Sequence, residues 1–171
     1  MIDVFDDFLS AEEHKEIYDV VSSSKFLWQW YPTTVSQNHQ ADSPVFYRMI
    51  EGNFDDDMYS EGVVWRKKII DKLDINVTEV MRTRLNMSYP TLNPPPFNGI
   101  HKDAEVTGNF KSILYYLNDA DGPTYFFNAV PQIVQPKANR LVMFDADIRH
   151  ASSQPQTTDR RLVMNIVVRF E

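Results

Sequence analysis

The sequence predicts an α+β fold in which two N-terminal helices precede a run of short strands that form a barrel or a sandwich. Two segments of the first 78 residues carry apolar residues at helical spacing. Beyond them, short runs rich in β-branched and aromatic residues are separated by turn sequences rich in Gly, Pro, Asn and Asp. Short, closely spaced strands of this kind are typical of barrels and sandwiches.

The chain of 171 residues is predicted to form a single domain, with helical support over about residues 1–78 and the barrel core over about 79–171. Apolar residues make up 43% and charged residues 24%, which is ordinary globular composition and argues against disorder. The formal net charge of −7 gives no electrostatic reason to expect nucleic acid or an anionic membrane as a partner.

The sequence contains no cysteine, which excludes disulfides, thiolate metal sites and cysteine nucleophiles and fits a reducing compartment. Its first residues are acidic and lack the basic start and apolar run of a secretory signal. No stretch approaches the ~18 apolar residues that span a bilayer. We therefore expect a cytoplasmic protein.

The first helix is predicted over residues 11–23 because Ser10 and Glu13 have the spacing of a capping box. His14 should lie at the edge of the buried face of this helix rather than serve as a metal ligand. A second helix is expected to start near Ser60, and its buried stripe consists of Trp65, Ile69 and Leu73.

The strands are predicted where β-branched and aromatic residues gather between turn signals. They are expected over residues 79–89, 112–117, 124–127, 140–146 and 161–170. Residues 89–99 contain four prolines and should form a stiff connector, since proline cannot donate to a central ladder.

Two further segments have alternative interpretations. Residues 36–62 are polar without sustained periodicity, which predicts a long surface excursion in which Asp55, Asp56 and Asp57 form a solvated acidic loop rather than a cation site. The aromatic residues of "FLWQWYP", 26–32, could either wall a binding groove or form an edge strand that buries alternate side chains.

A histidine and an aspartate two positions apart suggest half of a metal site. If residues 99–106 enter a strand, His101 and Asp103 project from the same face about 6–7 Å apart. A third ligand must come from elsewhere in the chain, and the remaining imidazoles are those of His14, His39 and His150. His150 follows a strand toward a rim, whereas His39 lies in a polar loop and is expected to face solvent. Two histidines and one carboxylate form the facial triad of non-haem Fe(II) oxygenases.

The last predicted strand begins with two arginines. Alternation places Arg161 and Asn165 on one face of this strand, while Arg160 belongs to the opposite face. One guanidinium can therefore point into the barrel and bind a carboxylate in a bidentate manner.

Five segments occur in an order known from one family: "YPTLNPPPFNGIHKD", "SILYYLND", "GPTYFF", "PKANRLVMFDADIRH" and "RRLVMNI". Over about residues 79–170 the chain resembles the 2-oxoglutarate/Fe(II)-dependent dioxygenases, specifically their prolyl 4-hydroxylase-like branch. The resemblance implies a double-stranded β-helix, a jelly-roll or cupin-like barrel with supporting N-terminal helices. It also implies that His101, Asp103 and His150 bind Fe(II).

The resemblance further implies a binding site for 2-oxoglutarate. Arg161 is preferred to Arg160 for the C5 carboxylate because the family commonly has a polar residue four positions later, which matches Asn165. Tyr116 matches a position whose hydroxyl donates to the same carboxylate, and Tyr115 should face a hydrophobic layer on the other side of the strand. Tyr89 matches a pocket-lining tyrosine but could also be a core aromatic at a strand end.

The chain departs from the family pattern in one turn and carries two acidic residues that the pattern does not use. Pro123 replaces one of a pair of glycines and removes a backbone donor. Asp145 and Asp147 precede the second histidine but match no ligand of the family. Relatives in which a small residue replaces this carboxylate use the vacant position for halide, so the presence of Asp103 implies hydroxylation rather than halogenation.

The implied activity couples oxidative decarboxylation of 2-oxoglutarate, with O2, to hydroxylation of a C–H bond. The expected substrate is a peptidyl or free amino acid such as proline, so the partner is a small molecule, peptide or protein, and ascorbate is an additional candidate cofactor. Two alternatives remain at this point: a non-catalytic cupin-like binding module, and an AlkB-type nucleic-acid demethylase.

Overall fold

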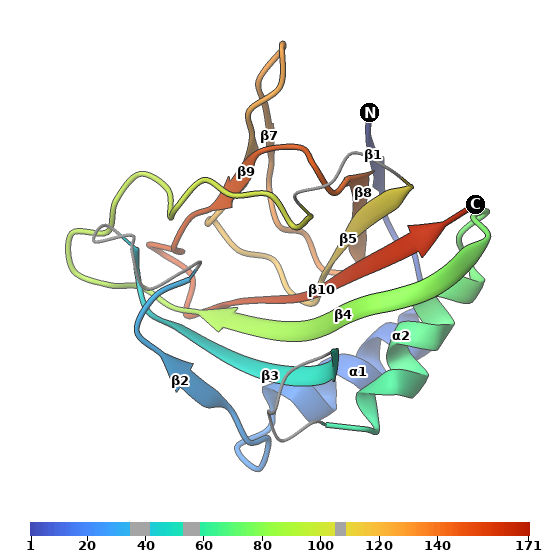
Figure 1. The fold of residues 1–171 in the computed structure, drawn as a ribbon. Helices are drawn as coiled ribbons and strands as arrows, with labels where there is room; N and C mark the ends of the chain where they lie inside the picture. Colours follow the sequence, from blue (N-terminus) through green and yellow to red (C-terminus); the bar gives the residue numbers. More distant parts are fainter. Residues whose placement is uncertain (35–41, 53–58, 105–108) are drawn as a thin grey trace.

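The computed structural model describes residues 1–34, 42–52, 59–104 and 109–171, and these form two helices and ten strands (Figure 1). The helices are α1 (Ala11–Ser22) and α2 (Gly62–Asp71). The strands are β1 (Ile2–Phe5), β2 (Gln29–Tyr31), β3 (Val45–Gly52), β4 (Val77–Ser88), β5 (Phe110–Tyr116), β6 (Thr124–Phe126), β7 (Gln132–Val134), β8 (Arg140–Asp145), β9 (His150–Ser152) and β10 (Arg161–Phe170).

The strands form two antiparallel sheets. The larger sheet has the order β1-β8-β5-β10-β4-β3-β2, and the smaller sheet has the order β7-β6-β9. In Figure 1 the two helices lie below the larger sheet, and β7 and β9 lie above it. The larger sheet is therefore a shared wall, with helices on one face and the smaller sheet on the other.

Both predicted helices are confirmed, and α1 begins at the predicted cap. The Ser10 hydroxyl accepts from the Glu13 backbone N–H (3.2 Å), and the Glu13 carboxylate accepts from the Ser10 N–H (3.0 Å). This reciprocal pair satisfies two amide groups that have no partner within the helix. The Ile17 and Val21 side chains are buried, which fixes α1 against the sheet.

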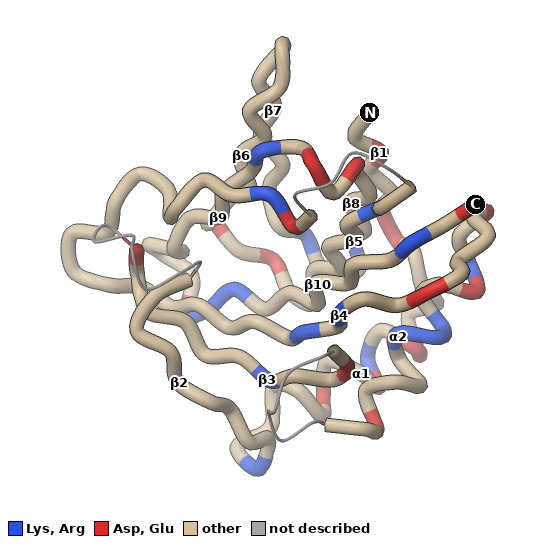
Figure 2. The backbone as a smooth tube through the Cα atoms, viewed as in Figure 1, with Lys and Arg blue, Asp and Glu red and all other residues tan. Residues whose placement is uncertain are grey.

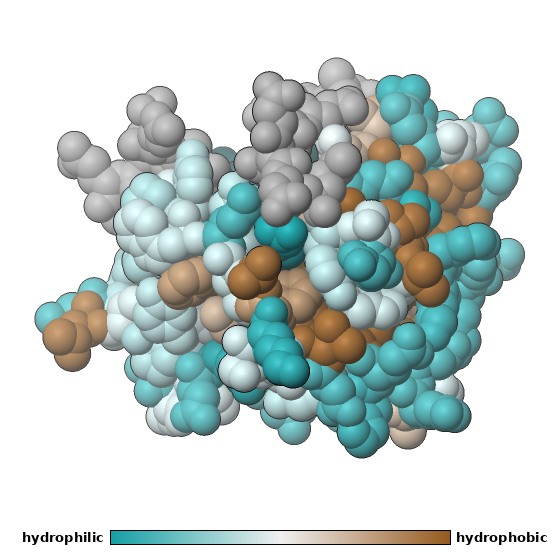
Figure 3. Space-filling model, turned by 90° about the horizontal axis from the view of Figure 1, so that it is seen from below, coloured by the Kyte–Doolittle hydropathy of each residue, from teal (hydrophilic) through white to brown (hydrophobic). Residues whose placement is uncertain are grey.

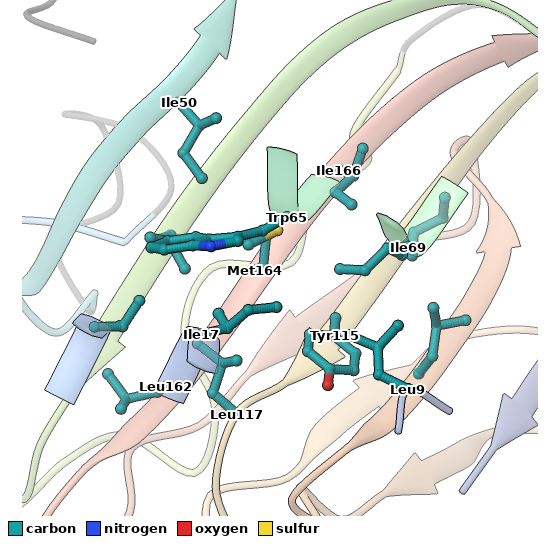
Figure 4. Packing of buried hydrophobic residues seen from close by; sticks show 14 of the residues in the cluster. Leu9, Ile17, Ile50, Trp65, Ile69, Tyr115, Leu117, Leu162, Met164 and Ile166 are labelled. Atoms are coloured by element: carbon teal, nitrogen blue, oxygen red, sulfur yellow. The ribbon is translucent and has the colours of Figure 1, made fainter. Parts of the chain in front are cut away.

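The main hydrophobic core lies between the helices and the larger sheet. Trp65 and Ile69 of α2 meet Met164 and Ile166 of β10 within one buried cluster, as Figure 4 shows. A second cluster, which includes Phe126 of the smaller sheet, lies between the two sheets. The alternation predicted for residues 161–170 is thus confirmed, because even-numbered residues face the helices and odd-numbered residues face the space between the sheets.

The prediction of a long surface excursion over residues 36–62 is wrong in part, because β3 occupies eight of those residues and pairs with β4. Arg48, Met49 and Ile50 are all buried in this strand, and a register shift between Met49 and Glu51 interrupts the pairing. A buried arginine inside the strand and this irregularity conceal the period of two in the sequence. The predictions for His39 and Asp55–Asp57 lie outside the described residues.

The N-terminal segment also contributes more to the sheet than predicted. Within residues 1–78, expected to give helical support, β1 pairs with β8 and β2 pairs with β3. The edge-strand interpretation of residues 26–32 is confirmed in part: β2 forms an edge of the larger sheet over Gln29–Tyr31, but Trp30 is 57% exposed rather than buried. Phe26 and Trp28, next to it in the sequence, pack against the main core. The boundaries of the single predicted domain stay a prediction.

The surface carries charges of both signs. Figure 2 shows Lys and Arg interspersed with Asp and Glu along most elements of the described chain. Seen from the helix side in Figure 3, much of the surface is hydrophilic, with smaller groups of apolar residues between. No helix in the described part of the chain is long and apolar enough to cross a bilayer.

Candidate metal centre

Three side chains far apart in the sequence converge between the sheets. One ligand atom each from His101, Asp103 and His150 lies within 4.8 Å of the others. The His150 Nε2 atom is 3.6 Å from the Asp103 Oδ2 atom, and the centroids of the two imidazole rings are 4.4 Å apart. Two ligands can have this separation when each lies about 2.0–2.2 Å from one ion.

Backbone contacts bring the two histidines together. His101 and His150 form an isolated bridge, in which the His101 N–H donates to the His150 carbonyl (3.0 Å) and the reverse bond measures 2.9 Å. The Asp103 N–H donates to the Ala146 carbonyl (3.0 Å). The condition that residues 99–106 enter a strand is not met in the described part of this segment, where His101 forms only an isolated antiparallel bridge with His150. His150 also begins a short strand of its own rather than ending the preceding one.

Both imidazole rings are oriented for metal binding through Nε2. The His101 Nδ1–H donates to the Gly99 carbonyl, and the His150 Nδ1–H donates to the Ile148 carbonyl, each at 3.0 Å. Since a carbonyl can only accept, the proton of each neutral ring resides on Nδ1 and the Nε2 lone pair faces the other ligands. The donor set of two imidazoles and one carboxylate fits a divalent first-row ion such as Fe(II).

Asp103 is held by three side chains and is almost completely buried, with a side-chain exposure of 2%. The Arg82 guanidinium donates to Oδ1 (2.6 Å), while Ser112 (2.7 Å) and the Asn165 amide (3.3 Å) donate to Oδ2. Arg82 and Ser112 are partners of the carboxylate that were not predicted from the sequence. These donors fix the orientation of the carboxylate toward His150.

The protonation states of the site suit metal binding at neutral pH. Burial, reinforced by the neighbouring His150, lowers the pKa of His101 to about 4, so its imidazole is neutral. Burial alone would raise the pKa of Asp103, but the interactions with His150 and Arg82 outweigh it and hold that pKa well below its usual range. A metal therefore does not need to displace protons from either of these groups at neutral pH.

Arg161 lines the same cavity as the two histidines, and its side chain is buried. Its Nε–H donates to the Gly122 carbonyl and its Nη2–H to the Thr124 hydroxyl, both at 2.9 Å. The Tyr116 hydroxyl lies 2.7 Å from the Thr124 hydroxyl, and the Tyr116 ring centroid is 5.3 Å from the guanidinium. Burial lowers the pKa of Arg161, which the interaction with Tyr116 opposes. The guanidinium is thus a desolvated cation among neutral groups.

A cavity joins the metal ligands to the guanidinium. It is lined by His101, His150 and Arg161, together with polar residues of β4 and β10, and encloses ≈ 540 Å³ including its open mouth. Tyr89 is not among the described residues that line the cavity, and its ring centroid lies 5.5 Å from that of Phe46. Its predicted role toward the co-substrate therefore stays a prediction.

The remaining candidates of the sequence analysis lie elsewhere. Asp145 binds Lys111 (2.6 Å) and is not grouped with the three ligands. The His14 Nδ1 atom lies 2.7 Å from the Tyr115 hydroxyl oxygen, and Tyr115 is buried in the main core as predicted. Arg160 precedes Arg161 but does not line the cavity.

The fold is similar to that of solved oxygenases. No protein-family model matches the chain, and no curated protein matches it in sequence. A prolyl hydroxylase from Trichoplax adhaerens, in complex with a peptide of the hypoxia inducible factor oxygen degradation domain, is 18% identical, with 98% of this chain and 83% of that chain covered and a TM-score of 0.68. A Pseudomonas putida prolyl-4-hydroxylase is 16% identical, with 99% and 92% covered and a TM-score of 0.58.

A third solved structure, an oxidoreductase of the 2OG-Fe(II) oxygenase family from Burkholderia pseudomallei, is 14% identical, with 98% of this chain and 85% of that chain covered and a TM-score of 0.72. At these identities the likeness concerns the arrangement of the chain in space. The predicted fold is thereby confirmed: the chain has the double-stranded β-helix fold found in 2-oxoglutarate/Fe(II) oxygenases.

Proposed function

We propose that this protein is an oxygenase that uses Fe(II), 2-oxoglutarate and O2 to hydroxylate a C–H bond. One observation carries the proposal: two imidazoles and one carboxylate converge, and both imidazoles line the same cavity as a buried guanidinium. A metal bound by three protein ligands keeps open positions for a co-substrate and O2. The guanidinium supplies the charge that a dicarboxylate co-substrate requires at its far end.

Each residue would have a distinct role. His101, Asp103 and His150 would bind Fe(II), which supplies the reactive centre for O2 activation when 2-oxoglutarate is bound. Arg161 would bind the C5 carboxylate of 2-oxoglutarate, and the Tyr116 hydroxyl, now paired with Thr124, would donate to the same group. The low dielectric around the buried guanidinium would strengthen this ion pair.

Several observations support an amino-acid or peptide substrate. The two prolyl hydroxylases named above share the fold, and the structure from Trichoplax adhaerens contains a bound peptide. The net charge of −7 disfavours the AlkB-type alternative, which needs a basic surface for nucleic acid. The joint presence of all three ligands and a buried arginine disfavours the non-catalytic binding module.

Thermal stabilisation and turnover together test the proposal. Mn(II) with 2-oxoglutarate should raise the unfolding temperature more than either alone, because each ligand that binds only the folded state stabilises it. With Fe(II) and O2, 2-oxoglutarate should be converted to succinate, with ascorbate added to maintain the ferrous state. His150→Ala should abolish both effects, and Lys67→Gln on the exposed face of α2 should keep both. A wild-type protein that binds neither Mn(II) nor 2-oxoglutarate would refute the proposal.

A further inference from the structure

The cavity contains a second guanidinium, that of Arg84 on β4. Arg84 is the direct cross-strand partner of Asn165 on β10, and Asn165 lies four residues from Arg161. At about 3.3 Å per residue along a strand, the backbones of the two arginines are roughly 13 Å or more apart. The two arginines therefore contribute to different parts of the cavity wall.

The Arg84 side chain is oriented by a neighbouring aromatic ring. Its guanidinium carbon lies 5.6 Å from the ring centroid of Tyr47 on β3. This contact restricts the long side chain and so reduces the entropy that is lost when an anion binds. A planar guanidinium in a cavity is well suited to bidentate binding of a carboxylate.

Two amide oxygens near Arg84 lack a donor. Asn165 is 6% exposed, and its Nδ2–H donates to the Asp103 carboxylate, which fixes the direction of its Oδ1 atom. Among the described residues, this Oδ1 atom and that of Asn86 are buried without a hydrogen-bond partner. Both residues line the cavity. A buried acceptor without a donor is costly, so a ligand that carries N–H groups would relieve this cost.

The guanidinium and the two acceptors belong to neighbouring positions of β4 and β10 that line the cavity. Asn86 is two residues from Arg84 on the same face of β4, and Asn165 lies directly opposite Arg84 on the adjacent strand β10. A carboxylate can pair with the Arg84 guanidinium, and an ammonium group can donate to the Oδ1 atoms of Asn86 and Asn165. A residue within a peptide has neither charge on its backbone, whereas a free α-amino acid carries both on one carbon atom.

We propose that the primary substrate is a free α-amino acid, whose carboxylate binds Arg84 and whose ammonium group donates to Asn86 and Asn165. The inference rests on the proposed function and narrows its substrate class from peptidyl or free amino acids to free ones. The contact between Asn165 and Asp103 places this subsite beside the metal ligands, where a C–H bond of the bound amino acid can be attacked.

Binding measurements with defined probes test this inference. The complex with Mn(II) and 2-oxoglutarate is titrated with the free L-amino acids, L-proline included, and then with the carboxamide and the N-acetyl derivative of the one that binds most tightly. Removing either charge should weaken binding at least about 10-fold, as expected for a lost charge-assisted contact in a desolvated site. Equal binding of the free acid and its carboxamide would overturn the assignment to Arg84.

Variants provide an independent readout. Arg84→Gln should weaken amino-acid binding at least about 10-fold and leave the affinity for 2-oxoglutarate within about twofold, since Arg161 is untouched. Arg84→Lys should keep part of the amino-acid affinity. Arg169→Gln, which removes an exposed cation at the other end of β10, is the matched control and should change neither affinity.

The two proposals fail in different ways. If the wild-type protein forms no complex with Mn(II) and 2-oxoglutarate, the proposed function is refuted. If that complex forms but no free amino acid binds to it, only the inference about the substrate is refuted, and a peptide that binds instead would identify the alternative class.

Discussion

Replacing Arg161 should selectively destroy the binding of 2-oxoglutarate. In Arg161→Gln the side chain keeps hydrogen-bonding capacity but loses its charge and part of its length. The neighbouring variant Arg160→Gln is the matched control, because alternation directs the two side chains to opposite faces of the strand. This pair of variants also decides between the two arginines that the sequence left as alternatives.

The expected magnitude follows from the environment of Arg161. Its side chain is buried, and the partners of its guanidinium are a carbonyl and a hydroxyl rather than an acid. Losing one member of a buried charge pair costs about 2–5 kcal/mol of binding free energy, or roughly 30-fold to several thousand-fold in Kd. The unliganded protein should lose far less stability, because removing a desolvated charge offsets part of the loss of two hydrogen bonds.

Isothermal titration of the Mn(II)-loaded proteins with 2-oxoglutarate measures this effect. The Kd of Arg161→Gln should rise at least about 30-fold, and that of Arg160→Gln should stay within about threefold. Circular dichroism melting of both variants without ligand controls for misfolding. Unchanged affinity in Arg161→Gln, or lost affinity in Arg160→Gln, would refute the assignment of the anion site.

Three other predictions concern the stability of the fold and of the site. The pKa of His101 falls from its usual value near 6.5 to about 4 on folding. The metal-free protein should therefore lose up to about 3 kcal/mol of stability as pH falls from about 6.5 toward 4. In denaturant titrations at each pH, His101→Gln should remove this pH-dependent component. Asn139, at φ 62°, bonds to the Tyr115 hydroxyl and to backbone groups of the N-terminal segment. Asn139→Ala should therefore lower the free energy of unfolding by about 2–4 kcal/mol. Asn139→Gly should lose about 1 kcal/mol less, because glycine tolerates a positive φ, and equal losses in the two variants would contradict this reasoning. A Cβ atom on Gly122 would lie 2.6 Å from the Ser153 carbonyl oxygen, so Gly122→Ala should cost about 1–3 kcal/mol and weaken binding of 2-oxoglutarate, while unchanged affinity would show that this turn does not position the guanidinium.

The features that could be predicted from the sequence are those with a local cause. The cap at Ser10 depends on residues three positions apart, and it appears as predicted. The alternation along β10 depends only on the period of two, and it correctly separates Arg161 from the residues that face the helices. The sequence of β3 hides the same signal, because Arg48 is buried among apolar residues.

Features that depend on the path of the chain through space could not be predicted in this way. The connector before His101 forms no regular strand. Its approach to His150 depends on backbone hydrogen bonds between His101 and His150, which are 49 positions apart in the sequence. Alternation places Arg82 on the cavity face of β4, but only the docked connector shows that its partner is Asp103. The same holds for the second anion site, which requires β4 and β10 to be neighbours.

The proposed chemistry depends on one metal ion bound among His101, Asp103 and His150. Anomalous diffraction from crystals grown with Mn(II) and 2-oxoglutarate tests it most directly. We predict a single strong peak within about 2.0–2.3 Å of Nε2 of His101, Nε2 of His150 and a carboxylate oxygen of Asp103, with the co-substrate extending from it toward Arg161. A peak at other residues, or none between these imidazoles at saturating Mn(II), would contradict the account.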